Sequence, residues 1–227
     1  MSNQINFHPD RSMLVEFSAG TLETALTICV SAHLHFCDQC RSELLSLDQL
    51  GSQLMSDAKP SDIDESLLDT VMAKIDEAEL AQVNSKGSAR VPVNEKPSSF
   101  PFSVNKLIES TEHSATWSRL NYSLDIARLK TGQDKFEVAL HRLCAGGKAP
   151  KHDHQGIEYT VVLKGSLSDE RSVYSEGDFL VRQPGDIHQP MGGQNSECIC
   201  LSALSAPIKL TSPLGFLMKP WLQIRPM

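Results

Sequence analysis

The chain has 227 residues, of which 40% are hydrophobic and 22% are charged. This length suffices for two domains of ordinary size, and the composition is that of a globular protein. No apolar run approaches the ~18 residues of a membrane span, and the first residues lack the basic and apolar regions of a secretory signal. We therefore expect a cytoplasmic protein whose six cysteines are reduced or metal-bound.

The negative charge is concentrated in the first part of the chain. Residues 1–85 contain 4 basic and 14 acidic residues, a net charge of −10, whereas the remaining residues carry +3. Such a field repels nucleic acid and attracts basic partners. A solvated acidic helix surface would have the same composition. Both interpretations argue against direct binding of DNA by this part of the chain.

The first 80 residues predict four helices. A helix capped by Asp10 should end at Gly20, where a left-handed residue is often needed. A third helix should begin near the cysteines, and a fourth near Pro60. Apolar residues spaced by four support the second and the fourth helix: Leu22, Leu26 and Val30, then Ile63, Leu67, Val71 and Ile75. A bundle this small has little core, so a bound metal would supply stability.

The composition changes after the helices. Residues 84–102 are rich in Ser, Gly, Pro and Lys, which predicts an interdomain linker. Beyond them, short runs with β-branched or aromatic residues predict strands at 123–129, 136–143, 159–163, 178–181 and 198–204. Many short strands without helices between them indicate a sandwich or barrel. We therefore expect an α + β two-domain protein, with a small all-α bundle at 1–83 and an all-β domain at 103–227.

Three residues in the helical part have the spacing of metal ligands. His33 and Cys37 are four residues apart, on one face of a helix, and Cys37-x2-Cys40 allows both sulfurs to reach one ion. The candidates for a fourth ligand are His8 and His35, of which His35 lies on another face of the same helix. Two alternatives are buried cysteines beside a core histidine, or a redox pair, although no thioredoxin-like βαβ pattern surrounds it.

A second set of candidate ligands lies in the β region. His152 and His154 are two residues apart, so one strand directs both to the same side, and Glu158 has the same parity. His188 completes the set. Imidazole and carboxylate ligands suit zinc, iron, manganese or nickel and can leave positions open for water or substrate. Four ligands at these spacings make isolated polar histidines a weak alternative.

Other residues with reactive side chains have no predicted role. Cys198 and Cys200 share one face of a strand; a thiol switch is one interpretation, and buried structural cysteines are the more common outcome. Cys144 has no evident partner. His113 and His141 are unassigned, and His141 is expected at the surface or as a polar core residue.

The sequence SAGTLETALTICVSAHLHFCDQC resembles the zinc-binding anti-sigma domain. The resemblance implies a structural zinc held by His8 as the fourth ligand together with His33, Cys37 and Cys40. It also implies a domain that binds an extracytoplasmic-function (group IV) sigma factor and keeps it from RNA polymerase.

The segment from Gly146 to Gly165, which includes the first three ligands of the second set, resembles the first cupin motif. The segment from Gly177 to His188 resembles the second motif, with the proline one place late at Pro184 and Gly192 in place of its asparagine. This resemblance implies a cupin barrel (a double-stranded β-helix, or jelly roll) that holds zinc or another divalent metal (Fe, Mn or Ni) through His152, His154, Glu158 and His188.

The two parts together resemble the ChrR family of anti-sigma factors. This resemblance implies a transcription regulator without catalytic residues, which releases its sigma factor under oxidative stress, such as singlet oxygen, sensed through the metal-binding cupin domain. The alternatives are a dioxygenase-like cupin metalloenzyme with a regulatory N-terminal domain, and a regulator that senses a small ligand. The expected partners are a sigma factor and a small ligand or oxidant at the cupin site, with no direct binding to nucleic acid or membrane.

Overall fold

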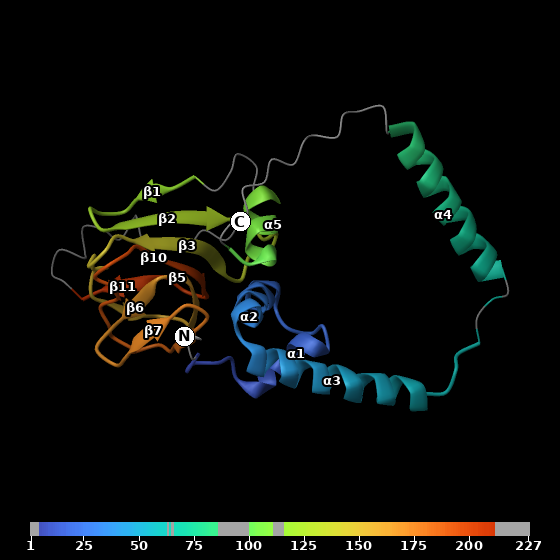
Figure 1. Ribbon diagram of the computed structural model, residues 1–227, viewed down its shortest axis with the longest axis horizontal. Helices are drawn as coiled ribbons and strands as arrows, with labels where there is room; N and C mark the ends of the chain where they lie inside the picture. The colour runs from blue at the N-terminus through green and yellow to red at the C-terminus, as the bar shows by residue number, and fades with distance from the viewer. Residues whose placement is uncertain (1–4, 63, 65, 86–99, 111–115, 212–227) are drawn as a thin grey trace. The chain divides into compact units, whose positions relative to one another are not determined.

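The computed structural model describes residues 5–62, 64, 66–85, 100–110 and 116–211. The chain divides into two compact units: residues 1–51 together with 100–227, and residues 52–99. Figure 1 shows helices in the N-terminal part and strands in the C-terminal part, which confirms the predicted α + β class. Most of the predicted linker lies outside the described residues, and the domain boundaries at 83 and 103 remain predictions. Within the described residues no helix is long and apolar enough to cross a membrane.

Four helices occupy the region where four were predicted. They are α1 (Arg11–Ser18), α2 (Thr24–Phe36), α3 (Asp38–Asp57) and α4 (Ser66–Ser85). Gly20, at φ +69°, follows the end of α1 as predicted. The fourth helix begins at Ser66 rather than near Pro60, because the Asp64 carboxylate accepts hydrogen bonds from the Ser66 N–H (2.8 Å) and hydroxyl (2.6 Å). Ile63, which was expected on this helix, lies outside the described residues.

A fifth helix, α5 (Phe102–Ser110), was not predicted. It begins directly after Pro101, a residue that suits the start of a helix. Val104 is fully buried, and Leu107 and Ile108 pack against the same core. These three residues have the i, i+3, i+4 spacing of a helix face, so the signal was present in the sequence.

The β region consists of antiparallel strands in three sheets. The strands are β1 (Ser118–Arg119), β2 (Leu124–Leu129), β3 (Glu137–Leu143), β4 (His152–His154), β5 (Glu158–Lys164), β6 (Ser166–Ser168), β7 (Val173–Ser175), β8 (Phe179–Arg182), β9 (Met191–Gly192), β10 (Cys198–Leu204) and β11 (Ile208–Leu210). The largest sheet has the order β1-β2-β3-β10-β5-β8, and the smaller ones are β7-β6-β9 and β11-β4. The five predicted strands are confirmed to within about one residue, and β4 is the strand on which His152 and His154 were expected. The strands that were missed have only two or three residues, too few to show a pattern.

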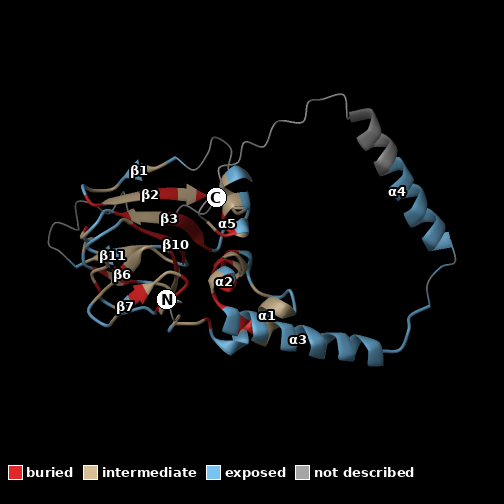
Figure 2. Cartoon of the chain, in the orientation of Figure 1, coloured by how far each residue is buried: buried red, intermediate tan, exposed pale blue. Residues whose placement is uncertain are grey.

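The six-stranded sheet is buried on both faces. Val161 and Leu163 of β5 face a core that also contains Leu14 of α1 and Val30 of α2. Val162, between them, belongs to a second core on the opposite face. The first core is covered by α2, which contacts β5, β10 and α5. Figure 2 shows the buried central strands of this sheet and the mostly exposed surface of α3. The first three helices and the sheet therefore share one hydrophobic core.

Candidate metal centres

The structure brings the eight predicted ligands together in two groups. In each group, one ligand atom from every residue lies within 4.8 Å of those of the others. The group in the helical part is called the N-terminal site and consists of His8, His33, Cys37 and Cys40. The group in the β region is called the β-domain site and consists of His152, His154, Glu158 and His188.

The N-terminal site is built where α2 turns into α3. His33 lies in the last turn of α2, Cys37 follows that helix, and Cys40 lies in the first turn of α3. His8 Nδ1 lies 3.4 Å from the Sγ of Cys37 and 3.4 Å from the Sγ of Cys40, and His33 Nε2 lies 3.3 Å from Cys40 Sγ. Ligands at ~2.0–2.3 Å around a tetrahedral ion are separated by roughly 3.3–3.8 Å. The donor set therefore fits one four-coordinate ion, while His35 is exposed and outside it.

Burial sets the protonation of the N-terminal site. Desolvation lowers the pKa of His33 to about 4, so its ring is neutral near pH 7. The His33 Nδ1–H donates to the Gly177 carbonyl at 2.6 Å, which leaves the Nε2 lone pair directed toward Cys40. Burial and the neighbouring Cys37 raise the pKa of Cys40 to about 12. Because this buried thiol ionises readily only beside a cation, its pairing with a neutral imidazole fits a soft divalent ion such as zinc.

The β-domain site is assembled from two strands and a loop. His152 and His154 lie at the two ends of β4, both buried, and Glu158 begins β5. His188 is held opposite His152 by a pair of backbone hydrogen bonds, each 3.1 Å long. The Nε2 atom of His188 lies 3.0 Å from that of His154 and 3.1 Å from that of His152. A Glu158 oxygen lies 3.5 Å from His154 Nδ1.

Outer hydrogen bonds fix the tautomers of two of these histidines. His152 Nδ1–H donates to the Pro150 carbonyl at 2.9 Å, and His188 Nδ1–H donates to the Asp169 carboxylate at 3.1 Å. Both Nε2 atoms therefore carry lone pairs, which converge without a proton between them. Two lone pairs at this distance repel each other unless a cation lies between them. The residues thus fit a bound metal ion with histidines oriented by outer-shell acceptors.

The local electrostatics of the β-domain site also favours metal binding. Burial lowers the pKa of His152 to about 4, and burial together with the neighbouring histidines lowers that of His154 to about 3. Neutral imidazoles are the form that binds metal. Burial raises the pKa of Glu158 to about 7, because nothing within reach compensates its charge fully. A divalent cation would stabilise the ionised carboxylate.

Asp169 and Arg182 support this site and were missed in the sequence. One carboxylate oxygen of Asp169 accepts hydrogen bonds from Arg182 Nη2 (2.5 Å) and from His188 Nδ1 (3.1 Å). Although burial opposes ionisation, these bonds hold the pKa of Asp169 well below its usual range. The three residues come from separate segments, so no spacing along the chain marks them as partners.

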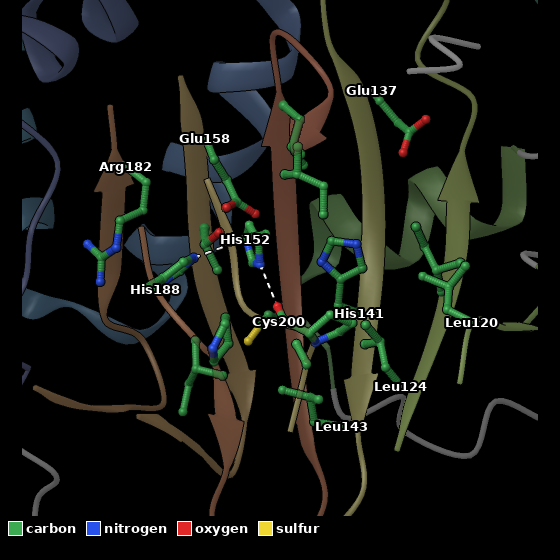
Figure 3. A pocket seen from close by; sticks show the side chains of 18 of the residues that line it. Leu120, Leu124, Glu137, His141, Leu143, His152, Glu158, Arg182, His188 and Cys200 are labelled. Carbon is green, nitrogen blue, oxygen red and sulfur yellow. Dashed lines mark hydrogen bonds between the residues drawn. The ribbon is translucent and has the colours of Figure 1, made fainter. Parts of the chain in front are cut away.

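A cavity of about 140 Å³ lies beside the β-domain site. Most of its wall is apolar, and Figure 3 shows Leu120, Leu124 and Leu143 on one side, with His152, Glu158 and His188 gathered on another. The wall also includes His141 of β3, whose Nδ1 lies 3.1 Å from the Ser202 hydroxyl. Burial lowers the pKa of His141 to about 4. The cavity gives a small molecule room beside the ligand set.

The remaining cysteines do not join either site. Cys198 and Cys200 are buried with their sulfurs 3.6 Å apart, and Cys200 lines the cavity. Their hydrogen bond and their burial raise the pKa of Cys200. Cys144 is exposed, and His113 lies outside the described residues.

Three comparisons with known proteins agree on the same group of relatives. Residues 106–206 match the family model described as the ChrR cupin-like domain. The chain is 32% identical to the anti-sigma-E factor ChrR of Cereibacter sphaeroides over 223 residues, which cover 97% of this chain and 99% of that protein. It is also similar to the crystal structure of Rhodobacter sphaeroides SigE in complex with the anti-sigma ChrR, with a TM-score of 0.70 and 27% identity over 88% of this chain and 99% of that chain. These matches confirm the predicted cupin fold of the β region.

Proposed function

Because the chain belongs to the ChrR family of anti-sigma factors, we propose that it binds an extracytoplasmic-function sigma factor and keeps it from RNA polymerase. We propose that it acts in the cytoplasm, because sigma factors and polymerase are found there. The relationship extends over nearly the whole chain, so it includes both the helical part and the β region. The protein then acts as a regulator through binding rather than as an enzyme.

The observation that carries this proposal is an exposed apolar stripe on α4. Leu67, Leu68, Val71 and Met72 are exposed by 45–67%, and no described side chain of this helix is buried. Such stripes are typical of helices that bind a groove on a partner. The same helix carries Asp69, Asp76 and Glu77, whose charges steer a basic partner toward it. A sigma factor, with basic surfaces that bind DNA, has the required chemistry.

The C-terminal half of α3 offers a second apolar surface. Leu50, Leu54 and Met55 are exposed by 53%, 65% and 77%. They lie beyond the part of α3 whose Leu44 and Leu47 pack against the core. We infer that this half of the helix also contacts the sigma factor.

The proposal is tested by mixing the purified full-length chain with each purified extracytoplasmic-function sigma factor of the source organism. One of them should form a stable complex on size-exclusion chromatography and lose its ability to direct transcription by RNA polymerase. Failure of all of them to bind the metal-loaded chain would contradict the proposal.

We propose that the N-terminal site holds zinc and that this zinc shapes the sigma-binding helices. The support is the tetrahedral fit of two thiols and two imidazoles at the junction of α2 and α3. Replacement of Cys37 or Cys40 by Ser should remove zinc and sigma binding together. Inhibition that persists without this metal would contradict a structural role.

We propose that the β-domain site holds zinc or another divalent metal and receives the stress signal, as an oxidant or a small ligand. The support is its converging lone pairs and the cavity beside it. Replacement of His152 and Glu158 should leave sigma binding intact and abolish the release of sigma under oxidative stress, singlet oxygen included. Loss of sigma binding in that variant would show that the two parts do not divide the work in this way.

A further inference from the structure

The segment that leads into His8 is bound to the start of β8. The Phe179 N–H donates to the Phe7 carbonyl at 2.9 Å. The Asp178 carboxylate accepts hydrogen bonds from the N–H groups of Asn6 (2.8 Å) and Phe7 (3.1 Å). Asp178 is only 1% exposed, so these bonds are shielded from water. The β region thus fixes the backbone that positions His8.

The same turn also holds a second ligand of the N-terminal site. The Gly177 carbonyl accepts the hydrogen bond from His33 Nδ1–H at 2.6 Å. Gly177 has a φ of +91°, and a Cβ at this position would lie 2.6 Å from the Cβ of Phe36 and 2.7 Å from Cδ1 of Ile5. Only glycine therefore allows this close approach between the helices and the turn. Two of the four ligands, His8 and His33, are positioned by residues 177–179.

The other end of β8 is bound to the β-domain site. Arg182, its last residue, is 7% exposed and donates to Asp169, which also accepts the hydrogen bond from His188. Arg182 also lies opposite Glu158 in the register of β8 with β5. Glu158 is therefore the neighbour of the last residue of β8 across the sheet, and His188 is linked to that residue through Asp169. Four residues of strand, about 13 Å at ~3.3 Å per residue, connect the two ends.

We propose that β8 couples the two metal centres, so that metal bound at the β-domain site slows the loss of metal from the N-terminal site. The inference rests on the proposed function in that both sites hold metal. Arg182 and Asp169 are buried and mutually paired, so a rearrangement of His188 or Glu158 displaces them together. A short paired strand transmits that displacement to Gly177 and Asp178, and from there to His33 and His8. Loosened ligands release their ion faster.

Cobalt distinguishes the two sites in the full-length chain. Co²⁺ bound to cysteine thiolates absorbs through sulfur-to-metal charge transfer, which a site of histidine and carboxylate lacks. The rate at which this absorbance decays in excess EDTA therefore reports the N-terminal site alone. Absence of the band in the wild-type chain would overturn the proposal along with the metal assignment on which it rests.

The contact at Gly177 has a matched control. Gly177→Ala should raise the rate of cobalt loss roughly 10- to 100-fold, as expected when an outer-shell contact is lost. Gly132→Ala imposes a comparable backbone strain, at φ +70°, with no atom within 4 Å of the added Cβ and away from both ligand groups, and should leave the rate unchanged. Equal rates in the two variants would overturn the proposal.

Variants at and opposite the C-terminal end of β8 test the coupling between the two sites. Arg182→Lys, and independently Glu158→Gln, should raise the same rate several-fold, whereas Arg119→Lys, a change of an exposed arginine on β1, should not. Circular dichroism checks that each variant folds. Faster loss in Gly177→Ala combined with wild-type rates in Arg182→Lys and Glu158→Gln would overturn the coupling. Sigma binding, measured separately, decides the proposed function: wild-type cobalt kinetics without sigma binding would refute that function alone.

Discussion

The Nε2 atoms of His152 and His188 lie 3.1 Å apart, and neither carries a proton, because each ring donates its Nδ1–H to another acceptor. This arrangement is favourable only around a cation. Removal of metal should therefore destabilise the β region, and divalent metal at 100 times its dissociation constant should raise the free energy of unfolding by about 2.7 kcal/mol. Thermal unfolding with and without chelator measures this effect.

The ligand set of the β-domain site is tested with His152→Gln, and His141→Gln is its matched control. Both residues line the cavity, but His141 is outside the ligand group. Metal analysis should give one ion per chain for His152→Gln and two for His141→Gln. Two tightly bound ions in His152→Gln would contradict the assigned ligand set.

The metal-free protein should lose stability as the pH falls from about 6.5 to about 4. His33, His141 and His152 have pKa values of about 4 in the folded chain, so between these pH values the unfolded chain binds protons that the folded chain does not. Glu158 acts in the opposite sense. Its raised pKa of about 7 adds to the free energy of unfolding, and this addition is complete below its ordinary pKa and is lost as the pH rises through 7. Because the three histidines outnumber this one carboxyl group, the free energy of unfolding should fall by roughly 3 kcal/mol or more between pH 6.5 and pH 4.

Urea unfolding of chelator-treated protein at several pH values measures the slope of the free energy of unfolding against pH. The variant His141→Gln should reduce it, because one buried neutral imidazole is removed. Stability that is constant or higher at pH 4.5 than at pH 6.5 would contradict the pKa shifts.

The helices α1–α3 and the six-stranded sheet should unfold in one cooperative step. Leu201 of β10 is fully buried in the core that they share. Leu201→Ala should therefore cost about 2–5 kcal/mol and lower the helical and the sheet signals together. Leu204→Ala, at a partly exposed position of the same strand, should cost less. Helical circular dichroism and tryptophan fluorescence that report different midpoints would contradict a common core.

The stripe on α4 should be needed for sigma binding and dispensable for folding. Leu68 is 67% exposed, so Leu68→Ser should weaken sigma binding by about 1–3 kcal/mol, a roughly 5- to 150-fold rise in Kd, with unchanged thermal stability. Val173→Ser changes an apolar residue of similar exposure, 66%, on β7, and should bind sigma as the wild type does. Isothermal titration calorimetry compares the two; equal affinities would remove α4 from the interface.

Part of each ligand group was predictable from local periodicity, whereas His8 and His188, distant along the chain from their partners, came from family resemblance. His33 and Cys37 share a helix face, and His152 and His154 share a strand face, so spacing alone brings them together. Family resemblance selected His8, which the structure places with the others. Metal identity does not follow from spacing, since several ions accept the same donors.

The contacts between the helices and the sheet were not predictable in the same way. Asn6 and Asp178 are 172 residues apart, and nothing in either segment marks the other as its partner. The consecutive apolar residues Val161, Val162 and Leu163 do indicate a strand buried on both faces, yet they do not identify the elements that cover it. The helix α5 was missed because its polar and Pro-rich surroundings resemble a linker.

The two buried faces of the six-stranded sheet give odd and even positions of β5 separate tasks. Glu158 and Thr160 line the cavity, while Val161 and Leu163 support the helices. Within the family, substitutions at even positions should follow the chemistry of the signal, and those at odd positions should follow the fit of the helical part. A single-residue insertion in β5 would exchange the two sets, because register alternates with every residue. Point substitutions at the even positions can therefore change the signal that the cavity recognises, while the face that packs against the helices stays unchanged.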